Sequence, residues 1–504
     1  MALSLVRQGI ETESLVGSED TQVLLRAEAM VSGAGREAVK ILLADAYLAL
    51  GAVEVQAGRV VLDGTVYAQA AYRLGDEASV RALTAQTTLN HAVDMDGAMA
   101  KMIARAEGEV EHVEASYENG HMIFRIAVRL RVKVLNLSPV EVISQISGVS
   151  GLEVKFEEIC STKLSAEANA DALLREAVTL PAALDARCAL MDWFSTQIED
   201  VSRDLGGVRV TGKVLVEALI ASGVAGRPVA LVKYAMPFDQ LVELPDWLTE
   251  DVNAAVEVKK LISQVDEGGQ NDSTLKLEAE LAVHVYAMGK DCATALADAY
   301  TTSDEGIAIE QQKVELLLGI NRVACHDSYK STMLLPTGAP GVGAVLATRA
   351  IPTLSGFESL EGHTVFEGIL EATALYMPAG SDKLCSATAE LPFSLHCQGE
   401  LPQDAWVNVR VTNAEASTLM SDRLELRATL ELSGESRITR EVTIAQDVTE
   451  AEAAPRKTGI VIVWPTAEDD LWTIGKRYRI SSSAIREMNG GGETEAGKAI
   501  VARM

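Results

Sequence analysis

The residue types that could carry out chemistry are spread along the 504-residue chain and do not form known catalytic motifs. The seven histidines show no H-E-x-x-H spacing and no zinc-type pairing with cysteines. Cys325, His326 and Asp327 are adjacent, but neighbours on a strand point to opposite faces, so no nucleophile and base pair is expected there. The glycine-rich run 337–344 lacks the Lys-Ser or Lys-Thr that completes a phosphate loop. We therefore expect a protein that is not an enzyme and that has no metal site or cofactor.

Composition narrows the remaining classes of function. The net charge of −28 and the pI near 4.7 argue against nucleic acid or an anionic membrane as the main partner. No apolar run reaches transmembrane length and the first residues do not form a secretory signal, so we expect no membrane insertion and a cytoplasmic location. The six cysteines form no C-x-x-C pair, which favours buried, reduced thiols over disulfides or a zinc site.

The elements that must position any site are organised around a glycine-punctuated strand that occurs three times. The second glycines of the three copies, Gly64, Gly212 and Gly368, lie 148 and 156 residues apart. A glycine inside an alternating strand usually marks a bulge or a close approach of another backbone. The spacing is too long for a solenoid unit and fits three related domains in tandem.

Each copy is followed by a predicted β-hairpin. In the first copy, residues 110–117 and 122–132 alternate around Asn119-Gly120, a strong hairpin signal because both turn residues tolerate positive φ. The other copies continue into runs over 275–285 and 424–432 that are apolar at every second position, so one face of each hairpin should be buried. The sequence predicts a mainly β protein with three tandem antiparallel β-rich domains.

The C-terminal end has a different pattern. Residues 446–457 are charged and contain Ala and Pro without an aliphatic period, which predicts a linker. Residues 458–504 then predict a small βααβ domain, with Asp469 or Asp470 as the N-cap of its first helix. Unlike the acidic remainder, its helices carry a basic cluster that consists of Lys476, Arg477, Arg479 and Arg486.

This small domain resembles the LysM family. The motif is Asp470-Leu471-Trp472-Thr473-Ile474-Gly475-Lys476-Arg477-Tyr478, followed by Ser481, Asn489 and a closing strand led by Gly497. The resemblance implies a groove for N-acetylglucosamine-containing glycans between the loop at Asp469 and Asp470 and the loop at Asn489 and Gly490. Where the family has Gly-Asp-Thr, this chain has two adjacent aspartates preceded by Glu468, so we expect weak or no sugar binding.

The three repeats followed by such a domain resemble the SPOCS (DUF3794) proteins of endospore-forming bacteria. The resemblance is carried by Thr179-Leu180-Pro181, by Leu334-Leu335-Pro336 and by strands 232–238 and 387–393, which both end in Pro-Phe. The first repeat has residues 85–89 in place of the Pro-Phe strand. The domains are placed at 1–145, 146–295 and 296–445. The resemblance implies a mother-cell protein at the forespore surface that binds the ATPase of the coat's basement layer.

Three functions are compatible with these patterns. The leading one is a non-enzymatic scaffold in spore-coat assembly, with self-association as an option for the repeats. Its partner would dock on Trp472, Lys476, Arg477 and Arg486, although Trp472 could instead pack beside Leu471 in the core. The alternative is a cell-wall protein that binds peptidoglycan, and the third is an enzyme with its active site in a repeat.

Overall fold

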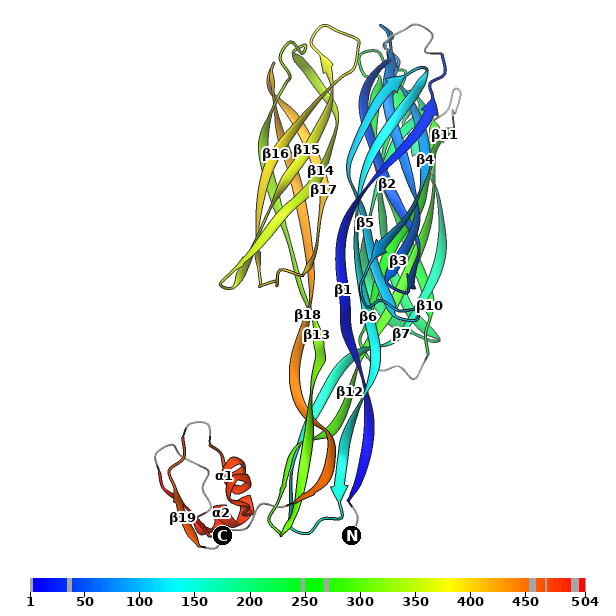
Figure 1. Ribbon diagram of the computed structural model, residues 1–504. Helices are drawn as coiled ribbons and strands as arrows, with labels where there is room; N and C mark the ends of the chain where they lie inside the picture. Colours follow the sequence, from blue (N-terminus) through cyan, green and yellow to red (C-terminus); the bar gives the residue numbers. More distant parts are fainter. Residues whose placement is uncertain are drawn as a thin grey trace.

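The computed structural model describes residues 3–33, 39–245, 250–266, 272–452, 459–466, 469–490 and 498–503. Three six-stranded repeats form elongated heads that stand side by side on a common stalk, and a small domain lies beside the foot of the stalk (Figure 1). The predicted fold class, mainly β with tandem antiparallel domains, is confirmed.

Repeats 1, 2 and 3 have the same topology. Each repeat consists of two three-stranded antiparallel sheets, one made of its first, last and fifth strands and the other of its second, third and fourth. Repeat 1 contains β1 Ser4–Met30, β2 Val39–Gln56, β3 Arg59–Leu74, β4 Arg81–Asp94, β5 Ile103–Glu118 and β6 His121–Ser147. Repeat 2 contains β7 Leu152–Leu180, a 3-10 turn Ala182–Leu184, β8 Ala186–Asp204, β9 Gly207–Ser222, β10 Val229–Glu243, β11 Val252–Asp266 and β12 Ser273–Thr301. Repeat 3 contains β13 Glu305–Leu334, β14 Val342–Leu360, β15 His363–Pro378, β16 Cys385–Gln398, β17 Trp406–Met420 and β18 Arg423–Glu452.

The repeated glycines lie at β-bulges, as predicted. Gly64, Gly212 and Gly368 occupy the central strand of their sheets, and in each repeat the register to the preceding strand shifts directly at the residue opposite. On the other side, Gly212 faces Phe238 and Gly368 faces Phe393. An added Cβ at either glycine would collide with the phenyl ring and with a carbonyl oxygen of the bulged strand. The aromatic ring of the Pro-Phe strand therefore fills the space that the glycine leaves.

The predicted hairpin at Asn119-Gly120 is also confirmed. β5 and β6 pair from Glu118 and His121 onward, and both turn residues have positive φ, 49° and 90°. The segment from Val39 to Leu50, whose Ala-rich composition is compatible with a helix, belongs to strand β2. Its strand partner β3 buries nearly every residue between Val66 and Leu74, and this packing outweighs local helix propensity.

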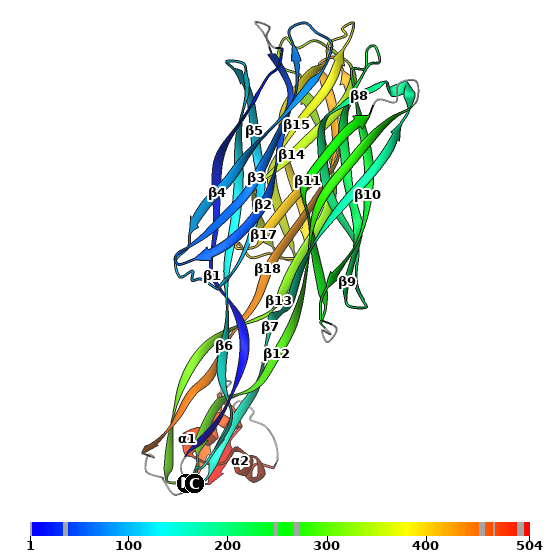
Figure 2. The ribbon, with the colours of Figure 1, turned by 90° about the vertical axis from the view of Figure 1, so that its right-hand side faces the viewer.

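The stalk is built by the ends of three pairs of long antiparallel strands, β1/β6, β7/β12 and β13/β18. Each of these strands is 27–30 residues long. The three strand pairs wind around one another below the heads (Figure 2). The stalk comprises residues 4–15 with 135–147, 152–164 with 288–301, and 305–317 with 439–452. Its apolar centre includes Ile143, Leu296 and Ala445, which occupy the same register position in the three repeats.

Strands of the stalk extend across the predicted domain boundary at 295/296 and into the predicted linker. The predicted boundary at 295/296 falls inside β12, and residues 446–452 of the predicted linker form the end of β18. The remainder of that linker, 453–457, lies outside the described residues. Residues 446–452 lack an apolar alternation, and Val448 is the buried residue among them.

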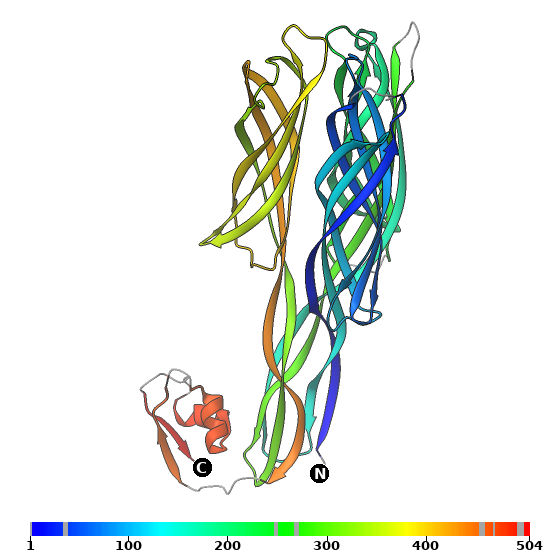
Figure 3. The same ribbon diagram turned by 45° about the horizontal axis from the view of Figure 1, so that its top comes forward.

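The three heads pack against one another around a common axis, which Figure 3 shows from a tilted view. Paired residues at one register position of each repeat meet there: Leu43 with Ala71, Met191 with Leu219, and Ala347 with Leu375. Two residues further along β2, β8 and β14, the equivalent positions carry Asp45, Trp193 and Arg349, here called the axial triad.

The axial triad joins all three repeats through polar contacts. The buried Asp45 carboxylate accepts hydrogen bonds from Trp193 Nε1 at 2.5 Å and from Arg349 Nε at 2.8 Å. The Arg349 guanidinium also lies 5.5 Å from the centre of the Trp193 ring, within cation–π range. The three equivalent positions carry three different side chains. The repeats could therefore not exchange places without losing the contacts of Asp45 with Trp193 and Arg349.

Four of the six cysteines are paired, contrary to the expectation of reduced thiols. Cys160 and Cys292 face each other across β7 and β12 and form a disulfide, and Cys325 of β13 is bonded to Cys397 of β16. The long sequence separations, 132 and 72 residues, hid both pairs from a search for local motifs.

Neither helix within the described ranges has the length or apolar character needed to cross a membrane.

The C-terminal domain, residues 459–503, has the predicted βααβ order. It contains β19 Ile460–Val463, α1 Leu471–Tyr478, α2 Ser482–Met488 and β20 Ile500–Arg503. Its own apolar core includes Leu471, Ile474 and Ile485, and the other members of that core also lie within this domain. It can therefore fold around its own core without the repeats.

Candidate docking surface on the C-terminal domain

Helix α1 is amphipathic, and its outer face is the predicted docking surface. Asp470 caps the helix: its carboxylate accepts a hydrogen bond from the Thr473 backbone N at 2.7 Å. Leu471 and Ile474 point into the domain core, while Trp472 and Lys476, four residues apart, share the opposite face. Trp472 is therefore outside the apolar core of its domain, and its role in partner docking stays a prediction.

The outer face of α1 lies against the stalk of repeat 2. Trp472 Nε1 donates a hydrogen bond to Asp298 Oδ2 at 2.9 Å, and Lys476 Nζ reaches the other carboxylate oxygen at 2.5 Å. The Tyr300 ring packs edge-on against the Trp472 ring, with the centroids 4.9 Å apart. Figures 1 and 3 show α1 on the side of the C-terminal domain that faces the stalk.

Arg479 and Tyr300 extend this contact beyond α1. Arg479, in the left-handed conformation that ends the helix, donates to the Thr301 carbonyl oxygen at 3.1 Å and to the Ser303 carbonyl oxygen. The Tyr300 hydroxyl donates to the Ile480 carbonyl oxygen at 2.8 Å. Burial raises the pKa of Tyr300 to about 12, so the hydroxyl stays a donor at neutral pH. We call the contact of Trp472, Lys476 and Arg479 with the stalk the clasp.

The remaining residues of the predicted docking surface lie outside the clasp. Arg477 is half-exposed and pairs with Asp469 at 2.7 Å, and Arg486 is exposed on α2. The cluster is thus divided: Lys476 and Arg479 contact the stalk, whereas Arg477 pairs with Asp469 of its own domain.

The predicted glycan loops are engaged in contacts within the domain. Asp469 accepts hydrogen bonds from the backbone N and the hydroxyl of Thr466, which hold the pKa of the Asp469 carboxyl below its usual value. Asn489 bridges to β20 through the Val501 backbone N and carbonyl oxygen, both at 2.8 Å. Gly490 follows with φ of 79°, whereas Glu468 lies outside the described residues. These polar groups make contacts within the domain, while residues 467–468 and 491–497 of the same region lie outside the described residues.

No sequence motif singles out the stalk residues that receive α1. Asp298 and Tyr300 lie close to the predicted domain boundary at 295/296, and the chain has many other acidic residues. A signal for Tyr300 does exist: it is one of few aromatic side chains in a chain with 4% aromatics, and it stands two residues after an aspartate.

The heads offer a second kind of candidate site, a cleft at each junction between repeats. The clefts between repeats 1 and 2, 2 and 3, and 1 and 3 have volumes of about 330, 400 and 240 Å³. In the first cleft, the half-buried Asp192 accepts a hydrogen bond from Ser263 Oγ at 2.7 Å, and desolvation of its carboxyl group raises the pKa of Asp192. The second cleft is lined in part by Trp193 and Arg349 of the axial triad.

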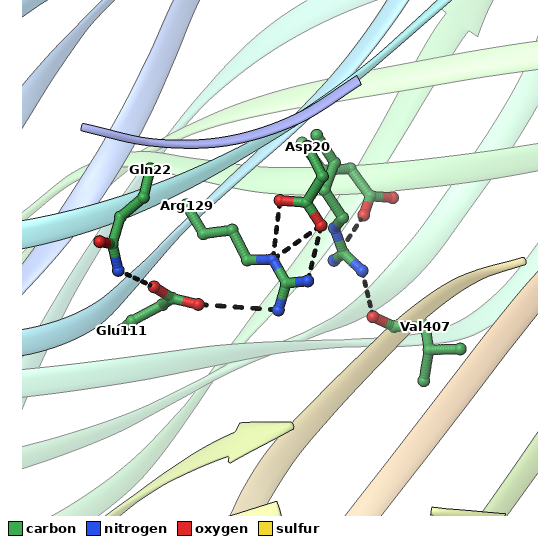
Figure 4. Close-up of polar contacts among 7 residues, drawn as sticks. Asp20, Gln22, Glu111, Arg129 and Val407 are labelled. Atoms are coloured by element: carbon green, nitrogen blue, oxygen red, sulfur yellow. Dashed lines mark hydrogen bonds and ion pairs between the residues drawn. The ribbon is translucent and has the colours of Figure 1, made fainter. Parts of the chain in front are cut away.

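The third cleft is bordered by charged side chains that are paired with one another (Figure 4). Arg129 donates three hydrogen bonds of 2.6 to 3.0 Å to the Asp20 carboxylate and lies 3.6 Å from Glu111, whose other oxygen accepts from Gln22 at 2.7 Å. Arg131 donates to the Val407 carbonyl oxygen and so ties repeat 1 to repeat 3. Because these groups satisfy one another, the clefts act as junctions between the heads.

The fold therefore defines a non-globular protein of three β repeats with a small domain docked on its stalk. Residues 37–118 match the family model described as SipL, SPOCS domain. The match extends through β2 to β5 and includes the Gly64 bulge, so this part of repeat 1 is similar to the SPOCS domain. The comparison with curated proteins and the comparison with solved structures gave no match.

Proposed function

We propose that this protein is a non-enzymatic scaffold in endospore-coat assembly that recruits a protein of the coat's basement layer through its C-terminal domain. The SPOCS match supports a role connected with sporulation. The order of three repeats and a LysM-like domain resembles the clostridial spore-coat morphogenesis protein SipL, and this resemblance supplies the partner, the coat-basement ATPase. On the same resemblance, the proposal includes a location in the mother cell, at the forespore surface.

The observation that carries the proposal is the outer face of α1. Trp472 lies outside the core of its domain, and Lys476 and Arg477 follow it on the helix. Trp and Arg are enriched among interface residues whose loss weakens binding most. The chain carries a net charge of −28, so a basic helix on its smallest domain is a distinct surface for an acidic partner.

The test uses the full chain and the purified coat-basement ATPase in a binding assay. Trp472→Ala should lower affinity about thirtyfold, which corresponds to about 2 kcal/mol. Trp464→Ala is the matched control because Trp464 is an exposed tryptophan of the same domain outside α1. Equal affinity of the Trp472→Ala variant and the wild type would refute docking through α1, and loss in the Trp464→Ala variant alone would move the surface to β19.

The glycan-binding alternative is tested with the same chain. We expect no micromolar binding of chitin oligomers or peptidoglycan fragments by calorimetry, because Asp469 and Asn489 are held by contacts within the domain. Micromolar affinity would favour the cell-wall function.

A further inference from the structure

The outer face of α1 cannot be held by the stalk and by another protein at the same time. In the clasp, the polar edge of Trp472 and the ammonium group of Lys476 both end on the Asp298 carboxylate. Tyr300 covers the Trp472 ring, and an added Cβ at Gly475 would lie only 2.5 Å from the Tyr300 hydroxyl oxygen. Helix and stalk are therefore in close contact along this face.

The receiving site is specific to repeat 2. Asp298 follows a β-bulge in β12, and the same register position carries Gln145 in repeat 1 and Asp447 in repeat 3. Asp447 forms an ion pair with Arg7 of strand β1 at 2.8 Å. The receiving site thus consists of Asp298 and Tyr300 of repeat 2, and the acidity of the stalk alone does not account for it.

We propose that the clasp is an autoinhibitory contact: the stalk of repeat 2 holds the C-terminal domain closed, and a partner must displace Asp298 and Tyr300 to reach Trp472 and Lys476. The identity of the partner rests on the proposed function, whereas closure rests on the contacts alone. A binding surface that is open in a fraction of molecules has its apparent affinity reduced by that fraction. Variants that open the clasp from the stalk side should therefore bind the partner more tightly.

The first experiment tests closure without any partner. The full chain is labelled with 5-fluorotryptophan at its five tryptophans, and the Trp472 signal in the ¹⁹F NMR spectrum is assigned by its loss in Trp472→Phe. Asp298→Ala should move the Trp472 signal and increase its solvent-induced isotope shift. Asp447→Ala is the matched control, because it removes an aspartate at the equivalent stalk position that is paired with Arg7 of the stalk.

An unchanged Trp472 signal in Asp298→Ala would overturn closure. A Trp472 signal that depends on protein concentration would also overturn it, since the contact would then be made with a second copy. A shift in Asp298→Ala alone, independent of concentration, supports the clasp.

The second experiment tests competition with the coat-basement ATPase as the probe. Asp298→Ala should bind it about tenfold more tightly than wild type, as expected if roughly nine molecules in ten are closed, and Asp447→Ala should bind like wild type. Equal affinity of Asp298→Ala and wild type would overturn competition. If neither Asp298→Ala nor wild type bound the ATPase, the proposed function and the competition that depends on it would be overturned. The ¹⁹F NMR signal of Trp472 would still show whether the clasp is closed.

Discussion

Replacing Asp45 should reveal how far the three repeats depend on one another. Asp45 lies in repeat 1, and its buried carboxylate receives hydrogen bonds from Trp193 of repeat 2 and Arg349 of repeat 3. Asp45→Ala leaves the guanidinium without its anion and the indole N–H without an acceptor. Breaking a buried ion pair costs about 3–5 kcal/mol and an unsatisfied buried donor about 1–3 kcal/mol.

The expected loss is smaller than the sum of these values. The Arg349 side chain is 30% exposed, so water can replace part of what Asp45 provided. We expect Asp45→Ala to lower the free energy of unfolding by about 3 kcal/mol, measured by urea denaturation followed by circular dichroism. Glu54→Ala, at an exposed position of the same strand, should stay within about 0.5 kcal/mol of wild type.

A double-mutant cycle makes this reasoning refutable. Arg349→Met removes the charge but keeps most of the side-chain volume, and once the arginine is gone the cost of Asp45→Ala should fall by about 1–2 kcal/mol. Additive losses, or a loss below about 1 kcal/mol for Asp45→Ala alone, would show that the axial triad does not hold the repeats together.

Three further predictions concern the heads and the cysteines. Gly368→Ala should destabilise by about 1–3 kcal/mol in urea denaturation because its Cβ would collide with the Phe393 ring, whereas Gly356→Ala in the same repeat has open space and should be nearly neutral. Burial raises the pKa of Asp192, so its favourable contribution is complete below the unfolded pKa and is lost as pH rises through the folded pKa. Asp192→Asn should therefore be more stable than wild type at about pH 7, and the difference should vanish near about pH 4; a difference that is constant with pH would contradict this. In the denatured, unreduced protein, thiol titration should find two reactive cysteines, Cys188 and Cys385, and six after reduction; six without reductant would show that the disulfides do not form.

Local signals made the hairpins and the C-terminal domain predictable. Asn119-Gly120 specifies its turn through two residues that tolerate positive φ, and the glycine at the centre of each repeat marks a bulge because only a glycine leaves room there. The helix cap at Asp470 is equally local, since the carboxylate and the backbone N that it accepts from are three residues apart.

Contacts between repeats could not be predicted in the same way. Asp45, Trp193 and Arg349 are unrelated residue types in three distant strands, and only the shared register shows that they occupy one position. The spacing of Trp472 and Lys476 predicts that they share a face, but the residues opposite them, Asp298 and Tyr300, depend on how the stalk passes the C-terminal domain. Such pairings arise from tertiary packing, which a single sequence does not encode locally.

The continuous paired strands of the stalk also set the length of the molecule. Each long strand runs without a break from the foot of the stalk to the top of a head, and 27–30 residues at 3.3 Å per residue span about 90 Å. Both chain ends and the turns between repeats lie at the foot (Figure 1). A layer attached there would be separated from anything bound at the tips of the heads by about this distance. Many such molecules standing side by side would therefore hold two layers of a shell apart at one thickness.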